Sequence, residues 1–140
     1  MKYPAAVVDT NVVVAGLLTE RADSPTARIL DAMRKGGFPF LLSPALLAEY
    51  REVLLRPKIR TLHQLRERDV DALLTEIVTN AIVRKPDRRP GAPDPKDDHV
   101  WSLVQSETKS VLVTGDYALV DSPPPGVDVL GPREFAALLR

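Results

Sequence analysis

Cysteine is absent from the sequence, histidine occurs only twice, and neither sign of charge is in excess. Without cysteine, the chain forms no disulfide bond and no thiolate-based zinc, iron–sulfur or redox site. Two histidines leave little material for an imidazole metal centre. The lack of disulfides fits a reducing compartment, so we expect a cytoplasmic protein.

The sequence also lacks any long apolar run. No segment approaches the roughly 18 consecutive apolar residues of a membrane-spanning helix. Asp9 interrupts the N-terminal apolar run before a secretory core forms. We therefore expect neither export nor membrane insertion. With 140 residues, 44% hydrophobic and 27% charged, the chain is predicted to fold as a single domain over residues 1–140.

Because the net charge is zero, overall electrostatics give no indication of a nucleic-acid partner. The basic residues are nevertheless clustered, with one group between Arg51 and Arg68 and a second between Arg84 and Arg89. These groups are either solvated surfaces or a phosphate-binding surface. The candidates for contacts with substrate phosphates are Arg51, Arg56, Lys58 and Arg60.

Strand-like and helix-like segments alternate along the chain, which predicts an α/β fold around a mostly parallel sheet. The run VVDTNVVVAGLL at residues 7–18 has the composition of a buried strand that carries one charge. The expected strands are residues 5–11, 82–86, 110–116 and 127–131, with a short extended segment at 38–43. The expected helices are residues 24–37, 44–55, one or two segments within 58–80, 98–108 and 132–140.

Two of the valine- and leucine-rich strands end in an aspartate, one in Asp9 and the other in Asp116. Functional groups of an open parallel sheet gather outside the carboxyl ends of its strands, so both side chains are expected at one rim. Asp116 by itself also fits a turn or cap residue after Gly115. The convergence of two strand ends is the first indication of function.

Further carboxylates are candidates for the same rim. Glu49 lies at the edge of the apolar stripe of its helix, where an unpaired carboxylate is costly and an arginine partner is a common alternative. Asp97 and Asp98 stand at the start of the helix 98–108, where each acid taken alone is more simply a helix cap. With the two strand ends, four elements offer carboxylates to one rim.

Carboxylates crowded at one place repel each other, by about 4 kcal/mol for two charges about 4 Å apart at an effective dielectric constant near 20. Such a group tends to share protons or to bind a cation. Oxygen ligands without cysteine or a histidine pair select hard ions, so Mg²⁺ or Mn²⁺ is expected. The chemistry that follows is hydrolysis of a phosphodiester bond by a metal-activated water.

These residues resemble those of the PIN-domain nucleases, in particular the VapC-like bacterial toxins of toxin–antitoxin pairs. The similarity covers nearly the whole chain, in the order VVDTNVVVAGLL, LLSPALLAEYREVLLRPKI, DPKDDHVWSLV, SVLVTGDYALV and VDVLGPREFAALL. The aspartate–threonine–asparagine start is weak by itself, whereas all these segments in this order are specific.

The resemblance implies a three-layer α/β/α sandwich and a divalent-metal site that cleaves RNA. The metal-binding and catalytic acids that it implies are Asp9, Glu49, Asp98 and Asp116, with Asp97 ranked below Asp98. The supporting residues that it implies are Thr10, Asn11 and Thr114. Lys96 departs from the pattern, because relatives often carry another acid in this loop.

The resemblance also implies a function and a set of partners. It describes an Mg²⁺- or Mn²⁺-dependent endoribonuclease, the toxin of a type II toxin–antitoxin pair, that leaves a 5′-phosphate and a 3′-hydroxyl. Its partners would be RNA, a cognate antitoxin protein and a second copy of the chain. No RNA-recognition motif is present, so the base preference is not readable from the sequence.

Two other functions stay open at this stage. A phosphatase that forms an aspartyl phosphate on Asp9 would, on the haloacid dehalogenase-like pattern, carry a second aspartate two residues later, where this sequence has Asn11. A catalytically weak or inactive PIN module that binds RNA or a protein partner is compatible with the same four carboxylates.

The histidines and the tryptophan are assigned minor roles. His63 is interpreted as a surface residue, and His99 as a partly exposed helix residue rather than a substrate contact. Trp101 is predicted to anchor the core or an interface rather than to stack on a base, because it lies within a helix.

Overall fold

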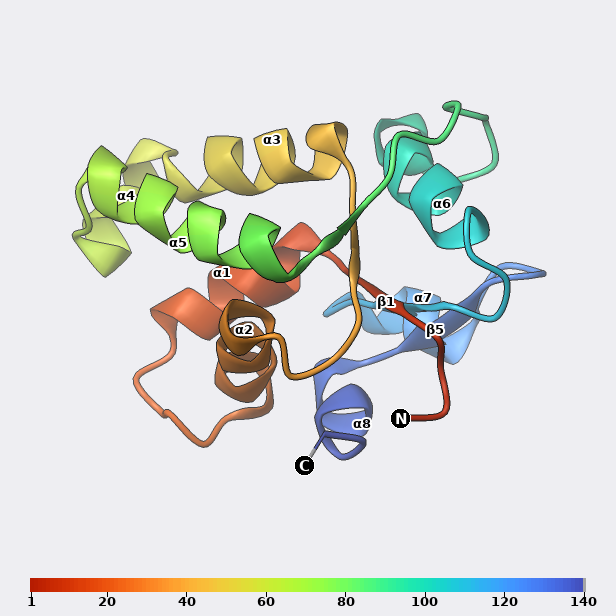
Figure 1. Ribbon diagram of the computed structural model, residues 1–140, viewed down its shortest axis with the longest axis horizontal. Helices are drawn as coiled ribbons and strands as arrows, with labels where there is room; N and C mark the ends of the chain where they lie inside the picture. The colour runs from red at the N-terminus through yellow and green to blue at the C-terminus, as the bar shows by residue number, and fades with distance from the viewer. Residues whose placement is uncertain (140) are drawn as a thin grey trace.

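The computed structural model describes residues 1–139 and has short parallel strands at its centre with helices on both sides (Figure 1). The strands are β1 (Ala6–Val8), β2 (Leu41–Leu42), β3 (Ile82–Val83), β4 (Val111–Val113) and β5 (Asp128–Leu130). β4 lies between β1 and β5, while β2 pairs with β3, and all these pairings are parallel. A bridge between Ala6 and Phe40 joins the two groups, which gives the order β3-β2-β1-β4-β5.

The helices connect successive parallel strands, as an α/β sandwich requires. They are α1 (Thr10–Leu18), α2 (Pro25–Lys35), α3 (Pro44–Leu54), α4 (Pro57–His63), α5 (Glu67–Asn80), α6 (Asp98–Gln105), α7 (Tyr117–Asp121) and α8 (Pro132–Ala136). A 3₁₀ turn, η1 (Pro95–Asp97), leads directly into α6. The fold class predicted from the sequence is therefore confirmed.

Most element boundaries follow local signals in the sequence. Ser24 precedes α2, and its hydroxyl accepts a hydrogen bond from the Ala27 amide at 3.3 Å. Gly36 ends the same helix with a φ of 72°, a left-handed conformation that glycine adopts without steric cost. The terminal helix predicted over 132–140 ends at Ala136, and residue 140 lies outside the described residues.

The sequence interpretation is wrong for residues 7–18 and incomplete after β4. β1 stops at Val8, and the valine-rich remainder forms α1 rather than continuing a strand. The helix α7 was not expected. In both places the aspartate that follows a strand caps the next helix, since the Asp9 carboxylate accepts from the Thr10 amide and the Asp116 carboxylate from the Ala118 amide. The valines of α1 are held in a helix by this cap and by packing against α2 and α3, which override their strand propensity.

The hydrophobic core lies between the strands and the helices and reaches the rim at Tyr50. This side chain of α3 is fully buried, and its hydroxyl donates to the Val8 carbonyl at the end of β1. Trp101 is buried in the core, as predicted. Within residues 1–139, no helix combines the length and the apolar character needed to cross a membrane.

Candidate active site

Asp9 stands where β1 ends and α1 begins. Its backbone amide donates to the Val113 carbonyl at 2.9 Å, which continues the pairing of β1 with β4. One carboxylate oxygen, Oδ1, accepts from the Thr10 amide at 2.9 Å, and Oδ2 accepts from the Thr114 hydroxyl at 2.9 Å. The carboxylate is therefore fixed from both strands at their carboxyl ends.

Asn11 links the loop after β4 to the first turn of α1. Its Oδ1 accepts from the Gly115 amide at 2.9 Å, and its Nδ2 donates to the Thr114 hydroxyl at 3.3 Å. The Thr114 side chain is fully buried and also accepts from the Asp116 amide at 3.1 Å. The three predicted supporting residues thus surround Asp9 and hold the two strand ends in register.

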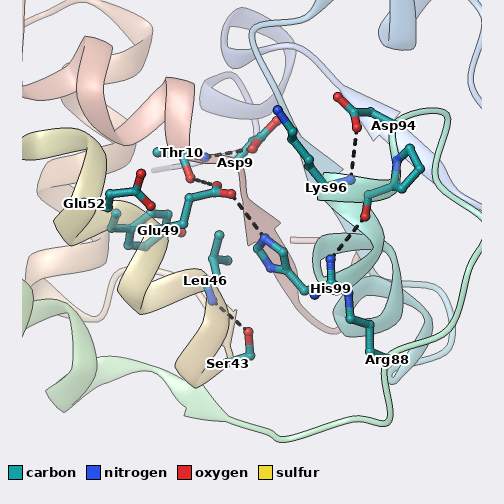
Figure 2. A network of polar contacts seen from close by, with 12 residues as sticks. Asp9, Thr10, Ser43, Leu46, Glu49, Glu52, Arg88, Asp94, Lys96 and His99 are labelled. Atoms are coloured by element: carbon teal, nitrogen blue, oxygen red, sulfur yellow. Dashed lines mark hydrogen bonds and ion pairs between the residues drawn. The ribbon is translucent and has the colours of Figure 1, made fainter. Parts of the chain in front are cut away.

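Glu49 extends from α3 toward the same place (Figure 2). Its Oε2 accepts from the Thr10 hydroxyl, and its Oε1 lies 3.2 Å from His99 Nε2. The arginine partner considered from the sequence is therefore replaced by a hydroxyl and an imidazole. His99 is only 12% exposed and belongs to this site, which the sequence interpretation missed. No local signal identifies it, because α3 and α6 meet only in the folded chain.

The structure separates two neighbouring acids that the sequence could not. Asp97 ends the 3₁₀ turn and lines the same pocket as Asp9. Asp98 begins α6, and its Oδ1 accepts from the Ala92 amide at 3.1 Å, which ties down the preceding loop. Asp97 therefore lines the pocket, whereas Asp98, at the start of α6, holds the loop before it. This placement favours Asp97 over Asp98, the opposite of the ranking expected from the sequence.

Asp116 has both of the roles considered for it. Its Oδ1 accepts from the Ala118 amide at 3.1 Å and caps α7, while the residue also lines the pocket beside Asp9. Its side chain is exposed. The cap therefore fixes the backbone at this carboxylate without burying it.

The pocket has a volume of about 530 Å³ and two chemically distinct parts. The acidic part contains Asp9, Asp97 and Asp116 together with Thr10 and Asn11. The apolar part is lined by Val14, Ala15, Leu18, Val53 and Leu119. The acids thus stand at one side of a groove along α1 rather than in a closed cavity.

The electrostatics of the rim favour a bound cation. Burial raises the pKa of Asp9, its hydrogen bonds with Thr114 and Thr10 lower it, and the nearby charges of Glu49 and Asp116 raise it further, to a net value above the ordinary 3.8. Burial likewise raises the pKa of Asp97, with contributions from the charges of Asp9 and Glu49. These carboxylates therefore repel one another, and a divalent ion would relieve the repulsion.

The donor atoms suit a hard divalent ion in kind but are not yet gathered around one point. Within residues 1–139, no three histidine, aspartate or glutamate side chains already enclose a position for a metal. Each oxygen of Glu49 has one partner, Thr10 or His99, which leaves a second lone pair on each oxygen for an ion. The charges of neighbouring carboxylates nevertheless contribute to the raised pKa values of Asp9 and Asp97.

The four residues predicted to bind phosphate differ in their surroundings. Arg51 points away from the rim and pairs with Glu67 at 2.5 Å and with Asp71 at 2.8 Å on α5. Arg56 pairs with Glu52 one turn earlier at 3.3 Å. Lys58 and Arg60 are exposed on α4, a helix that contributes no residue to the pocket lining. The structure therefore does not bring these four residues together with the acids.

His63 is half-buried rather than a free surface residue. Its Nε2 lies 2.8 Å from the Leu54 carbonyl, and its Nδ1 accepts from the Leu65 amide at 2.9 Å. The ring therefore bridges the end of α3 and the start of the segment that leads into α5. This role is structural and lies apart from the acids.

Carboxylates gathered at the carboxyl ends of parallel strands define an α/β protein with an acidic site at the rim of its sheet. The PIN domain family matches residues 5–118, a segment that contains every acid of this site. The chain therefore belongs to the PIN-domain family, whose members are generally nucleases that use divalent metal ions. It is also similar to an uncharacterized protein of Methanocaldococcus jannaschii, at 26% identity over 114 residues that span 81% of this chain and 72% of that protein.

Proposed function

We propose that this protein is a metal-dependent endoribonuclease that hydrolyses RNA phosphodiester bonds at the rim formed by β1 and β4. The observation that carries the proposal is the crowding of carboxylates from separate elements beside one open groove. Crowding of this kind contributes to the raised pKa values of Asp9 and Asp97 and has no structural benefit of its own, whereas it suits binding of a divalent cation.

Asp9, Asp97 and Asp116 would hold Mg²⁺ or Mn²⁺, with Glu49 as the fourth acid. The ion, when bound, lowers the pKa of a coordinated water and stabilises charge on the scissile phosphate. Thr114 and the Thr10 amide orient the Asp9 carboxylate through one hydrogen bond to each oxygen. Glu49 is oriented in the same way by the Thr10 hydroxyl and His99, so that Thr10 couples the two acids.

Replacing Asp9 with asparagine tests the proposal directly. Changes to residues that only orient a metal ligand already cost about 10- to 100-fold, so loss of a ligand should lower cleavage of single-stranded RNA with Mn²⁺ by more than about 100-fold. Glu49→Gln removes the charge of the fourth acid and should also lower cleavage. Its control is Glu52→Gln, since Glu52 lies on the same helix but is exposed and pairs with Arg56. Equal cleavage by wild type and Asp9→Asn would refute the assignment.

The neighbouring acids provide a second, sharper test. Asp97→Asn is expected to lower cleavage by more than about 10-fold at subsaturating Mn²⁺, and added Mn²⁺ should restore part of the loss. Asp98→Asn keeps an Oδ1 that can accept from the Ala92 amide, so its effect on cleavage should be smaller and independent of Mn²⁺. A larger and Mn²⁺-dependent loss of cleavage in Asp98→Asn than in Asp97→Asn would make Asp98 the metal ligand.

We further propose, from the family resemblance, that the enzyme is the toxin of a type II toxin–antitoxin pair in the cytoplasm. A cognate antitoxin protein and a second copy of the chain would then be its partners. The cheapest test is the neighbouring open reading frame, where a short gene for a DNA-binding antitoxin is expected. Growth arrest on expression, relieved by that partner and absent with Asp9→Asn, would support the role.

A catalytically inactive PIN module is the second candidate. The observation that favours it is that, among residues 1–139, the acids do not yet enclose a metal position. Calorimetric titration with Mn²⁺ separates the two functions. Heat that disappears in Asp9→Asn supports the nuclease, whereas no heat at millimolar Mn²⁺ supports the inactive module.

A further inference from the structure

A second pocket, of about 610 Å³, opens beside the acidic one. Its lining comes from the loop after β4, the start of α2 and the start of α8: Pro25, Thr26, Gly115, Tyr117, Pro132, Arg133 and Glu134. Asp116 lines the first pocket and its two neighbours in sequence line the second. Along this segment the two linings alternate, and the residue between the two that line the second pocket is one of the proposed metal ligands.

Tyr117 stands out among the exposed apolar side chains because it is aromatic and next to the acids. It is 51% exposed, and among residues 1–139 the other large apolar side chains with comparable exposure are aliphatic. The ring is supported by Gly131, since a Cβ built there would lie 3.0 Å from its Cε1. The absence of a side chain at this position lets the ring rest on the backbone while it stays open to solvent.

Hydrogen bonds fix residues 115–117 relative to the acids. The Gly115 amide donates to Asn11 Oδ1, and the Asp116 carboxylate caps the helix that begins with Tyr117. Any group stacked on the ring is consequently held at a defined position relative to the Asp116 carboxylate. This coupling distinguishes Tyr117 from an isolated surface aromatic.

The second pocket also contains an unpaired positive charge. Arg133 is exposed, and none of the ion pairs found within residues 1–139 includes it. Glu134 adds a carboxylate, which accepts hydrogen bonds but repels phosphate. An aromatic face, a hydrogen-bond acceptor and a guanidinium are the groups that recognise the base and the phosphate of one nucleotide.

We propose that this pocket binds one nucleotide of single-stranded RNA next to the bond that is cleaved. The base stacks on Tyr117, and Arg133 contacts a neighbouring phosphate. This inference rests on the proposed ribonuclease function, because it names a substrate subsite of the same centre. It adds a substrate-binding residue that lies outside the group of acids.

Binding measured without cleavage tests the subsite separately from catalysis. Anisotropy of a labelled ten-nucleotide RNA is followed in EDTA for wild type, Tyr117→Phe and Tyr117→Ala, with Leu62→Ala as the control for loss of an exposed apolar side chain. Loss of one base stacked on an aromatic ring should weaken binding about 5- to 100-fold. The phenylalanine variant keeps the ring and should bind like wild type, as should Leu62→Ala.

An oligonucleotide with abasic riboses is the decisive comparison. If stacking is responsible, this ligand binds wild type weakly, and Tyr117→Ala weakens its binding no further. Equal losses on the normal and abasic ligands, or no loss on either, overturn the proposal.

Arg133→Gln should reduce the slope of log K against log salt concentration by about 0.7, as expected for one phosphate contact, while Arg133→Lys should keep the slope. An unchanged slope in Arg133→Gln would show that Arg133 does not contact a phosphate.

The two proposals can fail independently. A wild type that binds RNA with the Tyr117 signature but does not cleave it refutes the nuclease and leaves the subsite standing. Cleavage that depends on Asp9 but has the same KM in wild type and Tyr117→Ala refutes the subsite alone. Under the proposal, Tyr117→Ala raises KM with little change in kcat.

Discussion

Two regions of this protein concentrate charge, and they do so in opposite ways. At the rim of β1 and β4, half-buried Asp9 and Asp97 face other carboxylates, and their pKa values are raised. On the outer side of α3, exposed Arg51 joins two carboxylates of α5, and a hydrogen bond with Arg51 lowers the pKa of Asp71. One region contains like charges without partners, and the other contains opposite charges that are paired.

The difference indicates which charge cluster is the better candidate for a function beyond stability. Pairing satisfies Arg51 within the chain, so it needs no ligand, although the sequence made it one of four candidates for binding phosphate. The acids at the rim have hydrogen-bond donors but no cationic side chain within ion-pair distance among residues 1–139, apart from His99 if it is protonated. Unpaired charges of one sign in a groove favour either protonation or a cation from outside, and that property distinguishes the candidate site.

The largest expected effect concerns a metal at the rim. Mn²⁺ at about 100 times its dissociation constant should stabilise the folded wild type by about 2.7 kcal/mol, because the unfolded chain does not assemble the acids. Thermal unfolding with and without Mn²⁺ measures this change. The same titration on Asp9→Asn should give a much smaller shift, and an equal shift in both proteins would locate the ion elsewhere.

Removing the hydroxyl of Thr114 should have the next largest effect on stability. Thr114→Val keeps the shape of a fully buried side chain but deprives Asp9 of a hydrogen bond and leaves the Asp116 amide without its acceptor. Leaving such groups unsatisfied costs about 1–3 kcal/mol, which urea unfolding would detect. Thr75→Val is the control, since the Thr75 hydroxyl donates only to the Asp71 carbonyl on the exposed side of α5.

Asp9→Asn should stabilise the metal-free protein at neutral pH, unlike most changes at buried polar positions. The folded chain has a pKa for Asp9 above the ordinary value of 3.8, so the folded state binds this proton more tightly than the unfolded state. Stability contributed by protonated Asp9 is therefore present below 3.8 and lost as pH rises through the raised value. The variant's higher Tm at neutral pH should shrink as the pH falls and vanish below about 3.8, where Asp9 is protonated in both the folded and the unfolded wild type. A Tm of Asp9→Asn that lies below that of the wild type by the same amount at every pH would contradict this account.

The smallest effect is expected in the paired region. Arg51→Gln breaks two exposed ion pairs, whose contribution is screened by solvent and salt. We expect RNA cleavage to be unchanged and Tm to fall less than in Thr114→Val. The residual effect has the opposite pH dependence from that at Asp9, because the lowered pKa of Asp71 adds stability above 3.8 that is lost on acidification. Loss of RNA binding in Arg51→Gln would restore the phosphate-contact hypothesis.

Local signals predicted much of the fold, and they failed where one residue carries two roles. Pro25, Gly36 and the apolar stripe of α3 mark their elements without help from the rest of the chain. The helix α1 was missed because its valines favour a strand and because Asp9 was considered only as the end of β1. Asp9 is also the helix cap, and a single carboxylate oxygen suffices for that role while the other faces Thr114.

The sequence by itself determined the alternation of strands and helices, the excess of valine and leucine that buries β1 and β4, and the aspartate at the end of each. Parallel strands then bring Asp9 and Asp116 to one rim whatever the details of the loops. Only the tertiary structure decided that Asp97 rather than Asp98 faces the pocket, that His99 meets Glu49, and that Arg51 is already paired. These outcomes depend on the relative rotation and position of helices distant in sequence, which packing sets and no local pattern encodes.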